Sequence, residues 1–162
     1  MSTAYHRSID ALFNLSLSTR SSSHFLLLDL ALPSTSPSLS GTRFAEFMRH
    51  LLLDLAGSRF GEILYLAVRY TDDQGRHRCH LGLLFEGTQR ADDVLARARS
   101  CWLVSAGMSA VITLTSTAMI HRGCHASEEE LRDCIMRCRR LTSRAGCRWR
   151  CSPSVPMLQL SL

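Results

Sequence analysis

The chain has 162 residues, of which 46% are hydrophobic and 20% charged, and this globular composition excludes a disordered chain. Its length fits one domain, so we expect a single domain over residues 1–162. No apolar run reaches the length of a membrane span and no secretory signal is visible, which predicts a cytoplasmic protein without membrane contact.

The N-terminal third of the chain predicts a helix, a strand and a second helix. Apolar residues recur at helical spacing over 4–17, whereas the continuous apolar run 24–32 predicts a buried strand. The two prolines of 33–40 predict a loop. Thr42 is the predicted N-cap of an amphipathic helix that ends near Gly57.

The middle of the chain predicts a β-hairpin, a helix and a further strand. The apolar segments 62–70 and 77–85 flank the turn residues 72–75, which is typical of a hairpin. Apolar residues over 91–103 follow a helical period, and the β-branched segment 110–120 predicts the fourth strand.

These elements predict an α+β fold of the ferredoxin-like type, in which a βαββαβ core forms an antiparallel sheet. The core spans residues 24–120, preceded by an N-terminal helix and linker over 1–23 and followed by a basic helix and tail over 121–162. The core helices cover one face of the sheet. The other face is therefore either open for binding or covered by the two terminal helices.

The C-terminal segment predicts one more helix and an extended tail. Ser127 and Glu130 have the spacing of a capping box, and the helix is expected to run to about Ala145, with Gly146 as its C′ residue. The tail from Cys147 onward contains two prolines and is expected to be an extended strand or arm.

Positive charge is concentrated in this C-terminal segment. All nineteen basic residues of the chain are arginine, the net charge is +5, and residues 132–150 hold seven arginines against one acid. Guanidinium groups bind phosphate and carboxylate through a bidentate fork, so we expect this surface to bind single-stranded DNA, RNA or an acidic host protein complex. The candidate binding residues are Arg132, Arg137, Arg139, Arg140, Arg144, Arg148, Trp149 and Arg150.

Cysteine and histidine residues offer weaker candidates for a metal site, and no other cofactor is expected. Cys134 and Cys138 share one helix face, and Cys147 with Cys151 can in principle complete a tetrahedral zinc site. The alternative is that these are core or interface cysteines. Asp29 at the end of a buried strand is expected to be either a metal ligand or the partner of an arginine.

Three segments together resemble a known family. The strand 25–30 resembles a first strand that ends in an R-x-D-L-like motif, and residues 68–85 resemble the pattern E-x-x-x-x-G-x-x-H-Y-H-x-x-L-x-x-N. Residues 98–102 resemble the following helix, which ends in a tryptophan. The family is the YagK/YfjJ family of prophage proteins, akin to inovirus replication proteins and to HUH rolling-circle initiators, and the resemblance covers roughly residues 20 to 145.

The chain departs from this family at the positions that carry catalysis. Arg78 and His80 stand where the family has two histidines on one strand face, and all three tyrosines precede His77, whereas the family's nucleophilic tyrosine lies on the C-terminal helix. A nicking reaction needs a metal and a nucleophile. The resemblance therefore implies a relaxase-like scaffold that has lost nicking, with His80, Arg78 and Asp29 as vestigial site residues.

Three functions follow from these residues. The first is a catalytically degenerate, initiator-like protein of a phage, prophage or plasmid that binds nucleic acid through the arginine-rich helix and an open sheet face. The second is a small effector of a mobile element, such as an anti-defence or anti-CRISPR inhibitor, that binds a host protein or ribonucleoprotein complex. The third is a residual metal-dependent nuclease that uses His80 with Asp29 or Glu62.

Overall fold

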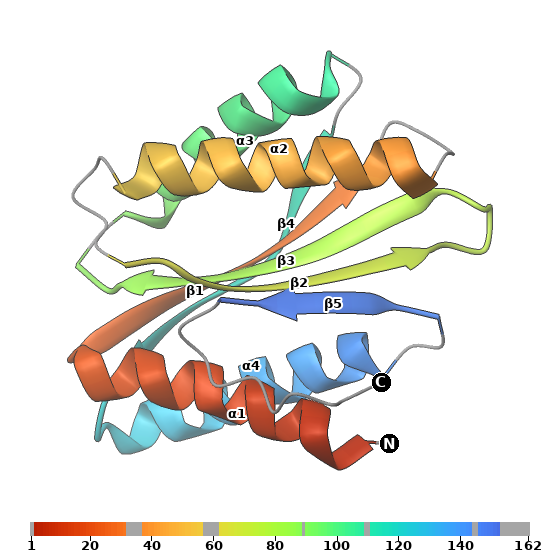
Figure 1. The fold of residues 1–162 in the computed structure, drawn as a ribbon. Coiled ribbons are helices and arrows are strands. Elements are labelled where there is room, and N and C mark those ends of the chain that lie inside the picture. The colour runs from red at the N-terminus through yellow and green to blue at the C-terminus, as the bar shows by residue number, and fades with distance from the viewer. Residues whose placement is uncertain are drawn as a thin grey trace.

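Helices and strands alternate along the chain in the computed structural model, which describes residues 2–31, 37–56, 62–88, 90–108, 111–143 and 146–152 (Figure 1). Within these ranges the side chains of residues 2–6, 37–40 and 149 are not described. The elements in chain order are α1 (Ser2–Thr19), β1 (Ser22–Ala31), α2 (Pro37–Ala56), β2 (Leu64–Thr71), β3 (His77–Glu86), α3 (Ala91–Ala106), β4 (Val111–His121), α4 (His125–Thr142) and β5 (Arg148–Cys151).

The five described strands form one sheet in the order β4-β1-β3-β2-β5, and every neighbouring pair is antiparallel. The core β1-α2-β2-β3-α3-β4 thus has the split βαβ arrangement, with β3 between β1 and β2. This confirms the predicted ferredoxin-like α+β fold with extra terminal helices. The described part of the predicted extended tail contains a strand, β5, which pairs with β2 at the sheet edge, and residues 153–162 lie outside the described residues.

Two separate apolar cores lie on the two faces of the sheet, because successive residues of a strand point to opposite sides. Leu26, Leu28 and Leu30 of β1 pack with α2 and α3, where Phe47 meets Trp102 edge-on with ring centroids 5.1 Å apart. The alternate β1 residues pack with α1 and α4. Figure 1 shows these two helix pairs on opposite sides of the sheet.

The second face of the sheet is therefore covered and not open. Phe25 and Leu27 of β1 are buried there together with Phe13 of α1 and Cys138 of α4. The expected open sheet face as a binding surface is wrong, because the amphipathic terminal helices bury their apolar stripes against it. None of the helices in the described ranges is long and apolar enough to cross a membrane.

Helix starts differ from the sequence-based expectation. α2 begins at Pro37, before the predicted N-cap Thr42, and proline suits the first position of a helix because its missing N–H would have no helical partner there. α4 begins at His125, so Ser127 lies inside the helix, and the predicted capping box is wrong. The buried Ser127 Oγ instead accepts a hydrogen bond from the backbone N–H of His121 at 3.2 Å.

Candidate functional site

Arg78 and Asp29 form an ion pair at the end of β1, on the sheet face covered by α1 and α4. Arg78 Nε donates to Asp29 Oδ1 at 3.4 Å, and Arg78 Nη2 donates to Asp29 Oδ2. The side chains are 24% and 16% exposed. The hydrogen bond to Asp29 raises the pKa of Arg78. Of the two roles expected for Asp29, the structure has the arginine partner.

His80 lies beside this ion pair, since the strand register sets it opposite Asp29. His80 Nδ1 is 3.8 Å from Asp29 Oδ1, and the imidazole stacks on the Tyr70 ring with centroids 5.0 Å apart. The vestigial residues predicted from the sequence are thus brought together. Arg78 cannot ligate a cation, because a guanidinium has no acceptor atom. The guanidinium instead neutralises the Asp29 carboxylate.

The four cysteines considered for zinc belong to the core between the sheet and the terminal helices. Cys134, Cys138 and Cys151 are buried there, and Cys147 packs against the same cluster. Burial raises the pKa of Cys134 to about 11 and that of Cys138 to about 12, so both thiols are protonated at neutral pH when no metal is bound. In the part of the chain that the structure describes, no three His, Cys, Asp or Glu side chains gather to hold a metal.

Cys124 differs from these buried cysteines because it is exposed, directly before the first turn of α4. Hydrogen bonds from the backbone N–H groups of Ser127 and Ala126 lower its pKa. Amide groups at a helix N-terminus stabilise a thiolate in this way. Because Cys124 is exposed and its pKa is lowered, we expect its thiol to be the most reactive among the described cysteines.

The arginines of α4 have two different environments. Arg132, Arg137 and Arg140 are exposed, as expected for a binding surface. Arg139 instead donates through Nη2 to both carboxylate oxygens of Asp10, at 2.7 and 2.6 Å, and so joins α4 to α1. Arg144 and the Trp149 side chain lie outside the described residues.

Arg148 and Arg150 of β5 lie on the other face of the sheet, where they line a groove of about 590 Å³. The opposite wall is α2, and the floor is β2, whose Arg69 pairs in register with Arg148. Arg69 lies with its guanidinium carbon 6.0 Å from the centre of the Phe44 ring. The arginines of α4 and those of β5 therefore lie on opposite sides of the sheet, because Arg148 and Arg150 are two residues apart in β5 and both point away from α4.

Sequence reasoning missed Arg69 as a member of this group. It lies 79 positions before Arg148, and only the pairing of β2 with β5 brings the two together. The sequence pattern that could have indicated this role of Arg69 is its spacing from Tyr65 and Ala67, which places all three on one face of the strand. That pattern becomes informative only when the neighbouring strand is known.

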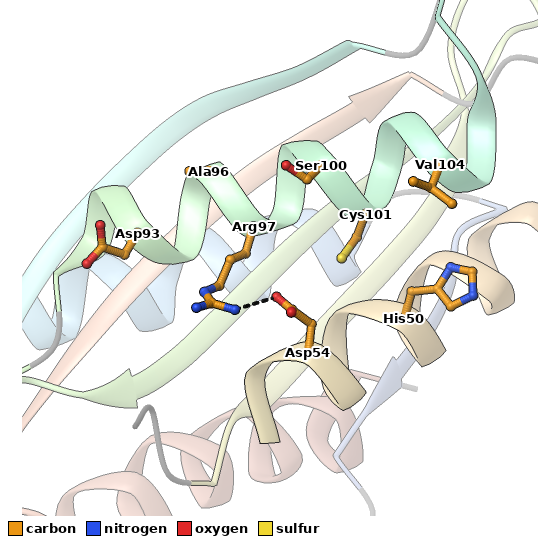
Figure 2. A pocket seen from close by; sticks show the side chains of 8 residues that line it. All are labelled: His50, Asp54, Asp93, Ala96, Arg97, Ser100, Cys101 and Val104. Atoms are coloured by element: carbon orange, nitrogen blue, oxygen red, sulfur yellow. Dashed lines mark hydrogen bonds and ion pairs between the residues drawn. The ribbon is translucent and has the colours of Figure 1, made fainter. Parts of the chain in front are cut away.

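A second cavity, of about 630 Å³, lies between α2 and α3. Figure 2 shows Asp54 of α2 and Arg97 of α3 meeting across it, with Arg97 Nη1 2.9 Å from Asp54 Oδ2. Cys101 points into the same space. Burial raises the pKa of the Cys101 thiol, and the Asp54 carboxylate adds to this effect, so the thiol is a poor nucleophile here.

The polar groups near this cavity do not form a catalytic pair either. His50 Nε2 lies 2.9 Å from Arg49 Nη2, and a guanidinium only donates, so Nε2 accepts. The proton of the neutral imidazole is then on Nδ1, which donates to Ser105 Oγ at 3.3 Å. His50 in this arrangement cannot take a proton from Ser105, so the described residues around the cavity offer an ion pair and no His-activated serine.

Neither a family model, a curated protein nor a solved structure matches this chain. The structure by itself defines a ferredoxin-like α+β protein with an arginine-lined groove on one face and a half-buried carboxylate–guanidinium pair on the other. The resemblance to replication initiators stays a prediction.

Proposed function

We propose that this protein binds nucleic acid without cleaving it, and that its scaffold is a catalytically degenerate relative of the replication initiators of phages, prophages and plasmids. The observation that carries this proposal is a set of exposed arginines near the C-terminus that form no ion pair with any described residue. The set comprises Arg132, Arg137, Arg140, Arg148 and Arg150.

Several other arginines of the chain are already paired with an acid. Arg76, Arg97 and Arg139 each have a carboxylate partner, at 2.8, 2.9 and 2.6 Å. Uncompensated guanidinium groups repel one another, and an anionic partner removes that repulsion. Phosphate suits them, because it accepts the paired hydrogen bonds that a guanidinium donates.

The absence of cleavage is supported by the ion pair of Asp29 with Arg78. A nicking reaction uses a metal ion to polarise the phosphate. Asp29 and His80 are the metal-ligating side chains at this place, and the guanidinium of Arg78 already neutralises the carboxylate. Electrostatic repulsion between a divalent cation and this guanidinium opposes metal binding.

Nucleic-acid binding is tested by fluorescence anisotropy with labelled single-stranded DNA, duplex DNA and single-stranded RNA over a range of salt concentrations. We expect the logarithm of the binding constant to fall linearly with the logarithm of salt, with a slope of about −0.7 per neutralised phosphate on a single strand. An R137Q/R140Q variant should have a shallower slope. R76Q/R97Q is the matched control, because it removes the same number of charges from arginines that are paired with Asp72 and Asp54. A flat salt response contradicts the proposal.

Cleavage is tested with single-stranded origin DNA in the presence of Mg²⁺ or Mn²⁺. We expect no nicked product. If the protein nicks this DNA and the R78A variant nicks it equally well, the degenerate-site part of the proposal is wrong.

A second candidate function is an effector that binds a host protein or ribonucleoprotein complex, and the exposed apolar residues around the start of β4 favour it. Met108, Val111 and Leu114 are 96%, 55% and 37% exposed. β4 also ends the strand order, so its outer edge can pair with an extended segment of a partner. A pull-down from nuclease-treated host lysate separates the two functions, because a partner retained without nucleic acid favours the effector.

A further inference from the structure

The groove between α2 and the β2–β5 edge concentrates positive charge in a way that the fold alone does not explain. Three arginines line it, and no Asp or Glu is among the described lining residues. Arg69 and Arg148 stand directly opposite each other on paired strands. Like charges at directly opposite positions destabilise a sheet, so an anion bound between these two arginines would stabilise the pairing.

Arg69 is also incompletely satisfied. Its Nε is buried and has no hydrogen-bond partner among the described residues. A buried donor without a partner is costly, and such groups in a cavity wall are commonly satisfied by a bound ligand or water. The unsatisfied Nε of Arg69 is thus an indication of a ligand that does not depend on the excess of positive charge in the groove.

The guanidinium of Arg69 is held against α2 before any ligand arrives. Phe44 lies beneath it, and a Cβ added at Gly41 would come within 3.3 Å of both Nη1 and Nη2. Glycine at position 41 therefore lets the guanidinium approach the helix closely. A cation held in place in this manner loses less entropy when it binds an anion.

Apart from Thr42, the described residues that line the rest of the groove are mainly apolar. Met48 of α2 and Tyr65 and Ala67 of β2 line it. Along β2, Arg69 and Tyr65 point to the same face four residues apart, with Arg150 opposite Ala67 between them. A volume of about 590 Å³ is in the range of small-molecule sites. The groove thus has a cationic end and an aromatic end.

We infer that this groove is a nucleotide site, in which Arg69, Arg148 and Arg150 bind phosphate groups and Tyr65 provides a surface for the base. The phosphates belong either to a free nucleotide or to a nucleotide of a nucleic-acid strand. The second source rests on the nucleic-acid binding proposed above, and the first does not. The site lies on the face of the sheet opposite Asp29 and Arg78.

Isothermal titration calorimetry tests the site with inorganic pyrophosphate, a nucleoside triphosphate and oligo-dT. The groove variant is R148Q/R150Q, and R90Q/R99Q, at α3, is the matched control, because it removes the same charge outside the groove and outside the arginines proposed for nucleic-acid binding. Both change exposed residues, and circular dichroism checks their folding. We expect the groove variant to weaken pyrophosphate binding by about tenfold or more, as the loss of charge-assisted hydrogen bonds implies, and the control to change it by less than about twofold.

The aromatic end is tested with Y65L. We expect this change to weaken binding of the nucleoside triphosphate by about fivefold or more and to leave pyrophosphate binding nearly unchanged, since only the triphosphate carries a base that can stack. Equal weakening of both ligands contradicts the placement of the base and leaves the phosphate site standing.

The outcomes distinguish this site from the proposed function. If oligo-dT displaces the nucleoside triphosphate, the phosphates are those of a strand; if the triphosphate binds and oligo-dT does not, the site stands and the nucleic-acid function fails. If the groove variant and the control weaken phosphate binding equally while oligo-dT still binds, the groove site is overturned alone. If the unchanged protein binds none of the three ligands, both proposals are overturned.

Discussion

Replacing Arg78 with methionine should destabilise the folded protein by about 2 kcal/mol. Removing one partner of a fully buried ion pair costs about 3–5 kcal/mol, whereas exposed pairs contribute about 0–1 kcal/mol. The Arg78 and Asp29 side chains are 24% and 16% exposed, which sets them between these limits and nearer to the buried one. The methionine keeps most of the apolar contact of the arginine stem, so the cost comes chiefly from the unpaired Asp29 carboxylate.

Urea unfolding followed by circular dichroism measures this loss, and a thermal melt should show a decrease of the Tm by about 4–8 °C, as expected for a chain of this size. The D29N and R78M/D29N variants complete a double-mutant cycle. We expect the double variant to be more stable than the sum of the two single losses implies, with a coupling of about 1–2 kcal/mol.

A coupling within about 0.3 kcal/mol of zero would refute this reasoning, because residues that do not interact give additive losses. The same would follow if R78M were as stable as the unchanged protein. In either case the pair would behave as a solvent-exposed one, and the guanidinium would not be needed to neutralise Asp29.

Three further predictions concern the cysteines and the Arg78 position. R78H sets a second imidazole beside His80 and Asp29, so Zn²⁺ or Co²⁺ should raise its Tm, whereas R78Q, which loses the same charge, should show no rise. Exposed Cys124, whose pKa is lowered, should react first with iodoacetamide at neutral pH, as peptide mass spectrometry will show; equal labelling of Cys138 in the folded protein contradicts this. Burial raises the pKa of Cys138 to about 12, so the folded state keeps a proton that the unfolded state loses, and stability should fall above about pH 9 by about 1.4 kcal/mol per pH unit for this thiol. C138A should have a shallower slope in urea unfolding at alkaline pH, and an unchanged slope would contradict the assignment.

The elements and the fold class followed from local sequence patterns. The apolar run of β1 and the hairpin of β2 and β3 lie where periodicity predicts them, and the core order completes a ferredoxin-like sheet. The first residues of the helices were predicted less well. Ser127 has the residue spacing of a capping box, but its hydroxyl accepts a hydrogen bond from the N–H of His121 at the end of the preceding strand.

Only some features of the candidate sites could be predicted from the sequence. Asp29, Arg78 and His80 were predicted as one site, and the register of β1 with β3 does bring them together. The exposed arginines of α4 were also predicted. Arg139 was not separable from its neighbours by sequence, because its pairing with Asp10 depends on how α1 packs against α4.

By itself the sequence determined the strands, the helices, the excess of arginine and the spacing of Arg78 and His80 on one strand, because each of these is a property of neighbouring residues. Only the tertiary structure decided that the terminal helices bury the second sheet face and that Arg148 and Arg150 join Arg69 across β5 and β2. The physical reason is that pairing between residues far apart in the chain is selected by the free energy of the whole packed fold, and short-range patterns do not encode it.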